Sequence, residues 1–168
     1  VMHDLEALAV ASPSLRHLAN ERRRLRTVPW GSGVWRFAEL VASDLKDDAL
    51  VSLPEGDTPL QRHESLERFC GVKELRLKHE GHNPTGSFKA RGIVAAIAMA
   101  KRLGVTEIGM PTAGNAGSAA AAYGARSGII AHVAMPADTP EAIIQEVINY
   151  GADLELVDGL ISDAGKLI

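Results

Sequence analysis

The pattern of hydrophobic and polar residues along the chain changes near residue 74. From there on, short apolar runs alternate with longer amphipathic segments, the pattern of strands and helices taken in turn. The predicted strands cover residues 74–80, 107–111, 129–136 and 152–159. The predicted helices cover residues 88–104, 118–128 and 139–151, and a last one begins at 162.

This alternation predicts an α/β fold built on a doubly wound parallel sheet with right-handed crossovers. Ligands of such sheets bind at the carboxyl ends of the strands. Two loops are expected there: the lysine loop NPTGSFK (83–89) and the asparagine loop PTAGNAG (111–117). In the helix over 139–151, Thr139 is the expected N-cap, Pro140 the first residue and Gly151 the end.

The first part of the chain has a different texture. Residues 2–26 show helical spacing, with an expected break at Ser12–Pro13, and a turn-rich connector follows over 28–35. A short amphipathic helix is predicted over 36–45, and a loop over 53–60, where prolines and a glycine interrupt regular structure. We therefore divide the chain into a helical extension with its connector (1–48) and an α/β portion (49–168).

Composition removes several classes of function. The net charge of -3, from 18 basic and 21 acidic side chains, argues against a nucleic-acid partner, so the arginines of ERRRLR (21–26) are interpreted as a solvated helix face. One cysteine, Cys70, forms no disulfide framework or zinc ribbon, which fits a cytoplasmic location. The longest apolar run, 93–100, is too short to span a membrane, and the N-terminus lacks the pattern of a signal peptide.

Lys89 is the first candidate for chemistry. It lies just inside a predicted helix N-terminus, in an apolar stretch, where the helix dipole and burial both disfavour a positive charge. An uncharged amine is what a nucleophile that forms a Schiff base requires. Taken alone, however, the residue is better interpreted as a surface lysine whose stem lies on its helix, because few lysines are catalytic.

The asparagine loop is the second candidate. Gly114 and Gly117 bracket Asn115 and allow a ligand to approach the main chain. The next helix directs its free N–H groups and positive dipole end at this loop, which favours a carboxylate or a phosphate. For the loop taken alone, an ordinary turn between strand and helix is the preferred explanation of the glycines, because short glycine patterns recur by chance.

Together the two loops resemble the fold-type II pyridoxal-phosphate enzymes, with a tryptophan synthase β-like fold, and most of all the threonine synthases. The motif GSFKARG is followed, 26 residues after Lys89, by the asparagine of PTAGNAG. GVWRF (33–37), EGDTPL (55–60) and the run from Met135 to Ile168 support the likeness. It covers residues 34–168 in order and implies an incomplete, N-terminal part of such an enzyme.

The resemblance implies pyridoxal 5'-phosphate as cofactor, with no metal. Lys89 matches the lysine that holds the cofactor covalently and then moves substrate protons, and Asn115 matches the asparagine that bonds the 3-hydroxyl oxygen of its ring. Phe88 would pack beside the cofactor. The loop that receives the substrate α-carboxylate would comprise Thr112, Ala113, Gly114 and Ala116.

The implied reaction converts O-phospho-L-homoserine and water to L-threonine and phosphate, a carbon–oxygen lyase reaction on a small amino-acid substrate. The alternatives are a threonine or serine dehydratase of the same fold, or a non-catalytic ligand-binding remnant. A metal protein using His79, Glu80 and His82 is a further, less favoured hypothesis.

Two further elements of the family have no candidate in this sequence. The glycine-rich cradle for the cofactor phosphate and the hydroxyl residue facing the pyridine nitrogen are expected beyond Ile168. We therefore expect the isolated chain to be inactive, and the complete protein to be a homodimer.

Overall fold

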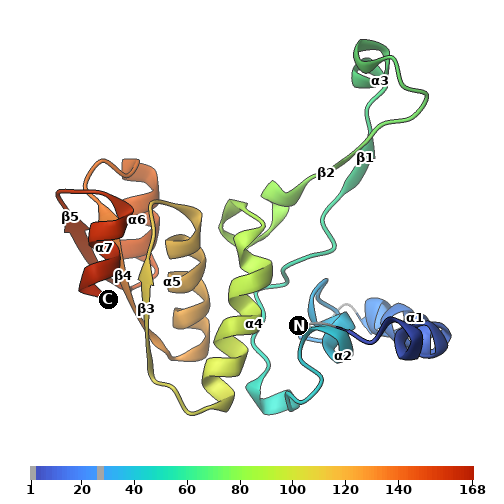
Figure 1. The fold of residues 1–168 in the computed structure, drawn as a ribbon, viewed down its shortest axis with the longest axis horizontal. Helices are drawn as coiled ribbons and strands as arrows, with labels where there is room; N and C mark the ends of the chain where they lie inside the picture. Colours follow the sequence, from blue (N-terminus) through green and yellow to red (C-terminus); the bar gives the residue numbers. More distant parts are fainter. Residues whose placement is uncertain (1–2, 26–28) are drawn as a thin grey trace.

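The computed structural model describes residues 3–25 and 29–168 (Figure 1). Three positions used in the predictions lie outside the described residues. They are the two termini of the first predicted helix, Met2 and Arg26, and the first residue of the connector, residue 28. Within them, three regions are visible in Figure 1: an N-terminal helical segment, a projecting arm, and an α/β unit at the C-terminal end.

The α/β unit is a three-stranded parallel sheet of order β3-β4-β5. Residue pairs Glu107↔Ile130 and His132↔Asp153 set its register. Helices α5 and α6 connect successive strands, and α7 follows the last strand. The bounds are β3 (Glu107–Pro111), α5 (Asn115–Ser127), β4 (Ile130–Pro136), α6 (Glu141–Asn149), β5 (Asp153–Val157) and α7 (Ile161–Leu167).

Helices cover both faces of this sheet. Ile108 and Met110 of β3 pack into a cluster with buried residues of α5 and α6. Gly109, between them, faces the other way, because a Cβ built on it would lie 2.1 Å from the side chain of Ile168, just after α7. The predicted doubly wound α/β arrangement is therefore confirmed for these three strands.

Helix α4 (Lys89–Arg102) packs beside α5 and carries the larger core. Small and β-branched side chains recur on its buried face, which lets the two helices approach closely. Trp35 is fully buried in the same core, and its indole N–H donates to the Val51 carbonyl at 2.5 Å. The buried face of α4 comprises Ala90, Val94, Ile97 and Ala98.

The strand predicted over 74–80 does not join the parallel sheet. Its core, β2 (Arg76–Lys78), pairs antiparallel with β1 (Leu60–Arg62), and α3 (Glu64–Cys70) lies between them. We call this hairpin, residues 60–78, the arm. All six strand residues are exposed, so the alternation read as a half-buried strand reflects a hairpin that stands away from the core in Figure 1.

Three helix predictions need correction. Helix α1 (Leu5–Leu25) continues through Pro13, although an interior proline removes one backbone donor and crowds the preceding turn. The helix predicted over 36–45 is a 3-10 turn, Trp35–Phe37, followed by a single turn, α2 (Ala38–Val41). Thr139 does not cap α6: Pro140 occupies the N-cap, and the Thr139 hydroxyl has no partner among the described residues.

Candidate active site

Lys89 and Asn115 are the first residues of two adjacent helices, α4 and α5. In Figure 1 the helices run side by side in the same direction, so both N-termini lie at the same end, beside the carboxyl end of β3. The turn that precedes Lys89 also packs against α5. The fold thus brings the lysine loop and the asparagine loop together, although 26 residues separate Lys89 from Asn115.

The lysine loop turns sharply before α4. Thr85 and Gly86, in the 3-10 turn Pro84–Gly86, have φ values of 59° and 65°, and the left-handed value at Thr85 is strained for a side chain with a branched Cβ. Ser87 is buried, and its hydroxyl accepts the backbone N–H of Lys89 at 3.3 Å. This geometry directs the chain abruptly into the helix.

The side chains at the head of α4 are open to solvent. Lys89 is exposed, so the expected burial of its amine is wrong for this chain. Its Nζ lies 4.8 Å from the ring centroid of Phe88, which is itself 58% exposed. Both groups can therefore be reached by a ligand, and a phenyl ring stands next to the amine.

Hydrogen bonds within the asparagine loop fix its conformation. The buried Thr112 hydroxyl accepts the Gly114 N–H at 3.1 Å, and the Gly117 N–H donates to the Gly114 carbonyl at 2.9 Å. Asn115 and Ala113 are exposed, while Gly114 and Ala116 are half-buried. The N–H groups of the first two residues of α5, Asn115 and Ala116, precede the first helical bond, so they can bind an anion.

Gly117 shows why a glycine follows in this loop. A Cβ at this position would lie 2.4 Å from Met135 Cε and 2.8 Å from Thr112 Cγ2. A side chain at this position would require the side chains of Met135 and Thr112 to shift. The glycine therefore allows close packing of helix on sheet, which fixes the place of Asn115 two residues earlier.

Glu80 accepts hydrogen bonds from residues at or near both ends of the lysine loop. Its carboxylate accepts Arg91 Nε at 2.7 Å and Nη2 at 2.9 Å, the Thr58 hydroxyl at 2.8 Å and the Asn83 amide at 2.9 Å. Hydrogen bonding by Arg91 is the main reason that the pKa of Glu80 falls to about 2, so the carboxylate is ionised. The sequence suggests Glu80 only as a potential metal ligand, whereas the structure shows its carboxylate bonded to Arg91.

Glu55 forms a second, fully buried cluster. Its carboxylate accepts the Tyr123 hydroxyl at 2.8 Å, the Ser52 hydroxyl at 3.1 Å and the Leu53 N–H at 3.0 Å. Burial raises the pKa of Tyr123, and the neighbouring Glu55 adds to the effect, so the phenol keeps its proton and donates it. This cluster ties the 53–58 loop to α5, and sequence reasoning did not find it.

The GVWRF and EGDTPL motifs are in backbone contact. Gly33 N–H donates to the Glu55 carbonyl at 2.8 Å, and a Cβ on Gly33 would lie 2.4 Å from Gly56 Cα. Asp57, in the same loop, accepts Arg36 at 2.8 Å and lies 3.4 Å from Arg23. The N-terminal segment thus contacts the 53–58 loop directly, and this loop contributes to the clusters around both Glu80 and Glu55.

The arginines near the end of α1 make contacts within the chain. Arg22 forms two 2.7 Å bonds with Glu39 and lies over the Trp30 ring, 4.3 Å from its centroid. Arg24 pairs with Glu21 at 2.7 Å. Arg22 is therefore a packing residue, not part of the solvated face that the sequence suggested.

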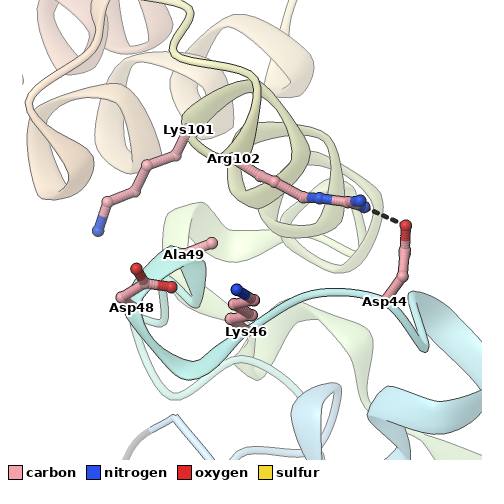
Figure 2. Close-up of a pocket in the computed structure, with 6 residues that line it drawn as sticks. All are labelled: Asp44, Lys46, Asp48, Ala49, Lys101 and Arg102. Atoms are coloured by element: carbon pink, nitrogen blue, oxygen red, sulfur yellow. Dashed lines mark hydrogen bonds and ion pairs between the residues drawn. The ribbon is translucent and has the colours of Figure 1, made fainter.

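The cavity drawn in Figure 2, of about 420 Å³, lies elsewhere. Lys101 and Arg102, at the last turn of α4, line it with Asp44, Lys46 and Asp48, and Arg102 pairs with Asp44. At 1.5 Å per residue this end of α4 is roughly 20 Å from Lys89. The cavity is therefore separate from the candidate site.

Residues 3–25 and 29–168 contain neither a cluster of metal ligands nor a helix able to span a membrane. No cluster of three or more potential ligands could hold a metal ion, and the carboxylate of Glu80 is already bonded to Arg91, Thr58 and Asn83. No helix in the same ranges is both long and apolar enough to cross a bilayer.

Residues 51–168 match the family described as pyridoxal-phosphate dependent enzyme. The chain belongs to this family. The threonine synthase of Methanocaldococcus jannaschii is 40% identical over 153 residues, which cover 90% of this chain and 36% of the relative. The threonine synthase of Halalkalibacterium halodurans is 42% identical over 124 residues, 73% of this chain and 35% of the relative.

Among solved structures, maize serine racemase is similar, with a TM-score of 0.61 and 27% identity over 66% of this chain and 33% of that chain. These findings confirm the fold-type II α/β fold, the likeness to threonine synthases and pyridoxal phosphate as the family's cofactor. The chain spans about a third of the length of the curated relatives it matches.

The donor set at the two helix heads fits this cofactor. It contains an exposed primary amine on Lys89, an exposed amide on Asn115 and the free N–H groups of α5. The hydroxyl oxygens of Thr85 and Ser118, on the turn and helix that meet here, are buried and have no hydrogen-bond partner among the described residues. An aldehyde and a ring oxygen would both find suitable partners in this set.

Proposed function

We propose that this chain is the cofactor-holding part of a threonine synthase, which converts O-phospho-L-homoserine and water to L-threonine and phosphate. The observation that carries the proposal is the common placement of Lys89 and Asn115 at the heads of α4 and α5, in a chain 40% identical to a threonine synthase over 90% of its length. We take residues 1–48 as an extension and 49–168 as the α/β portion of a two-domain enzyme.

Each site residue has a proposed role. Lys89 would bind the cofactor through its amine and, once released, would take and return protons at the substrate carbons. Asn115 would donate its amide N–H to the ring oxygen. The backbone of Thr112, Ala113, Gly114 and Ala116 would bind the substrate carboxylate, with Phe88 packed beside the ring. When bound, pyridoxal phosphate supplies an electron sink.

The exposure of Lys89 and Phe88 agrees with a site that is completed by further structure. We expect the isolated chain to turn over no substrate, and the complete protein to be a cytoplasmic homodimer. Size-exclusion chromatography with light scattering would test the oligomeric state.

The test is covalent trapping on the complete protein. Incubation with pyridoxal phosphate and reduction with borohydride should label Lys89, as read by peptide mapping, and Lys89→Ala should abolish both the label and the release of phosphate from phosphohomoserine. Label on another residue would contradict the site. Consumption of threonine without turnover of phosphohomoserine would instead indicate a dehydratase.

A further inference from the structure

Residues at or near the two ends of the lysine loop bond to the same carboxylate, that of Glu80. Asn83, the first residue of the loop, and Arg91, two residues after Lys89, both donate to Glu80. The Asn83 amide also donates to the Glu80 backbone carbonyl at 2.8 Å, which fixes this end twice. The segment 84–90 between them is closed at its base by side-chain bonds.

The same carboxylate joins the loop to a third segment. Thr58 donates its hydroxyl to Glu80, and the Asn83 side-chain oxygen accepts the Gly56 N–H at 2.9 Å. Arg91 Nη2 reaches the Thr58 hydroxyl at 3.2 Å. The lysine loop therefore cannot shift relative to the 53–58 loop without breaking charged hydrogen bonds.

We propose that Glu80 is a positioning residue, which closes the lysine loop between Asn83 and Arg91 and so sets the position of Lys89 at the head of α4. The inference rests on the proposed role of Lys89. It assigns to Glu80 a function through Arg91, Asn83 and Thr58, with no contact to cofactor or substrate.

The backbone of the loop explains the need for such closure. Thr85 is held at a φ of 59°, a conformation that persists only where surrounding contacts enforce it. Released from Glu80, Thr85 would relax toward a negative φ. Because Lys89 lies four residues later, at the start of α4, this change would alter the position from which its side chain leaves the helix.

The experiment compares Glu80→Gln with Glu67→Gln in the complete protein. Glu67 forms a similar bidentate pair with Arg62, at 2.8 and 2.9 Å, but in the arm. Two quantities are measured: amide hydrogen exchange over residues 84–90 without cofactor, and the pyridoxal phosphate concentration that half-saturates borohydride labelling of Lys89.

We expect Glu80→Gln to accelerate exchange in this segment about tenfold and to raise the half-saturating concentration by about the same factor. Glu67→Gln should change neither quantity by more than about twofold, because its pair with Arg62 lies in the arm. Equal effects of both variants, or no effect of Glu80→Gln, would overturn the inference.

A variant with a smaller defect keeps the test valid if Glu80→Gln does not fold. Thr58→Val removes one donor to Glu80 at nearly constant volume and should move both quantities in the same direction by a smaller factor; an unchanged value would overturn the inference. If the wild-type protein carries no label on Lys89, the proposed function itself fails, and this outcome is distinct from the others.

Discussion

The loops at the head of α4 and the arm each contain a glutamate with a bidentate arginine, yet the two pairs organise the chain differently. In the arm, Glu67 accepts from Arg62 and from the Leu75 N–H, all within the hairpin. At the head of α4, Glu80 joins Thr58, 22 residues earlier, to Arg91, 11 residues later. Similar chemistry stabilises a local turn in one place and assembles a candidate site in the other.

Burial separates the two regions as well. Fully buried polar side chains lie around the heads of α4 and α5, among them Glu55 of the 53–58 loop and Ser118 in the first turn of α5. The arm instead exposes Leu60, Phe69 and Val72. Substitutions in the first region should therefore be costly and those in the second nearly silent, and the following predictions test this contrast.

The largest effect should come from Trp35→Ala. The indole is fully buried and donates its N–H to Val51, so the variant loses apolar burial and leaves a cavity and an unpaired carbonyl. We expect the free energy of unfolding to fall by about 3–5 kcal/mol. Urea unfolding followed by circular dichroism measures it; a loss below about 1 kcal/mol would show that this part of the core is not cooperative with the rest.

Tyr123→Phe should have the next largest effect. It removes the hydroxyl that donates to the buried Glu55 carboxylate and changes little else in volume. We expect a loss of about 1–3 kcal/mol, because a buried acceptor is left short of a donor. Tyr150→Phe, at an exposed position, is the control and should remain within about 0.5 kcal/mol in the same unfolding experiment.

A smaller effect should appear as a pH dependence. Since the pKa of Glu80 is about 2 in the folded chain and its ordinary value is 4.5, the unfolded chain binds the proton more readily. The stabilisation by Glu80 is complete above about pH 4.5 and is lost as the pH falls toward 2. The stability difference between wild type and Glu80→Gln should shrink over this range, and a constant difference would contradict the assignment.

The smallest effect should come from the arm. Phe69 is 88% exposed, so Phe69→Ala removes almost no buried surface and should change the free energy of unfolding by less than about 0.5 kcal/mol. Thermal unfolding monitored by calorimetry would show an unchanged midpoint. A loss of 2 kcal/mol or more would mean that the arm packs against the rest of the chain, and would remove the contrast between the two regions.

Regular elements of the α/β unit were predictable because each has a clear hydrophobic period, as in α4, β4 and α6. The strand at 74–80 was placed in the wrong sheet because alternation reveals a strand and not its partner, and β1 contains too few apolar residues to be recognised. The bonds of Glu80 with Thr58 and of Glu55 with Tyr123 join residues 22 and 68 positions apart, and no local pattern encodes such a pairing.

The contact of Gly33 with Gly56 restricts which sequences this fold can accept. Gly56 also has a φ of 88°, so a side chain there would be strained as well as obstructed. In a saturation mutagenesis library selected for folding, both codons should return glycine almost alone, and a change at one should not be rescued by a change at the other. Gly33 and Gly56, 23 residues apart, therefore constrain each other through main-chain atoms. This dependence does not arise from contacts between side chains.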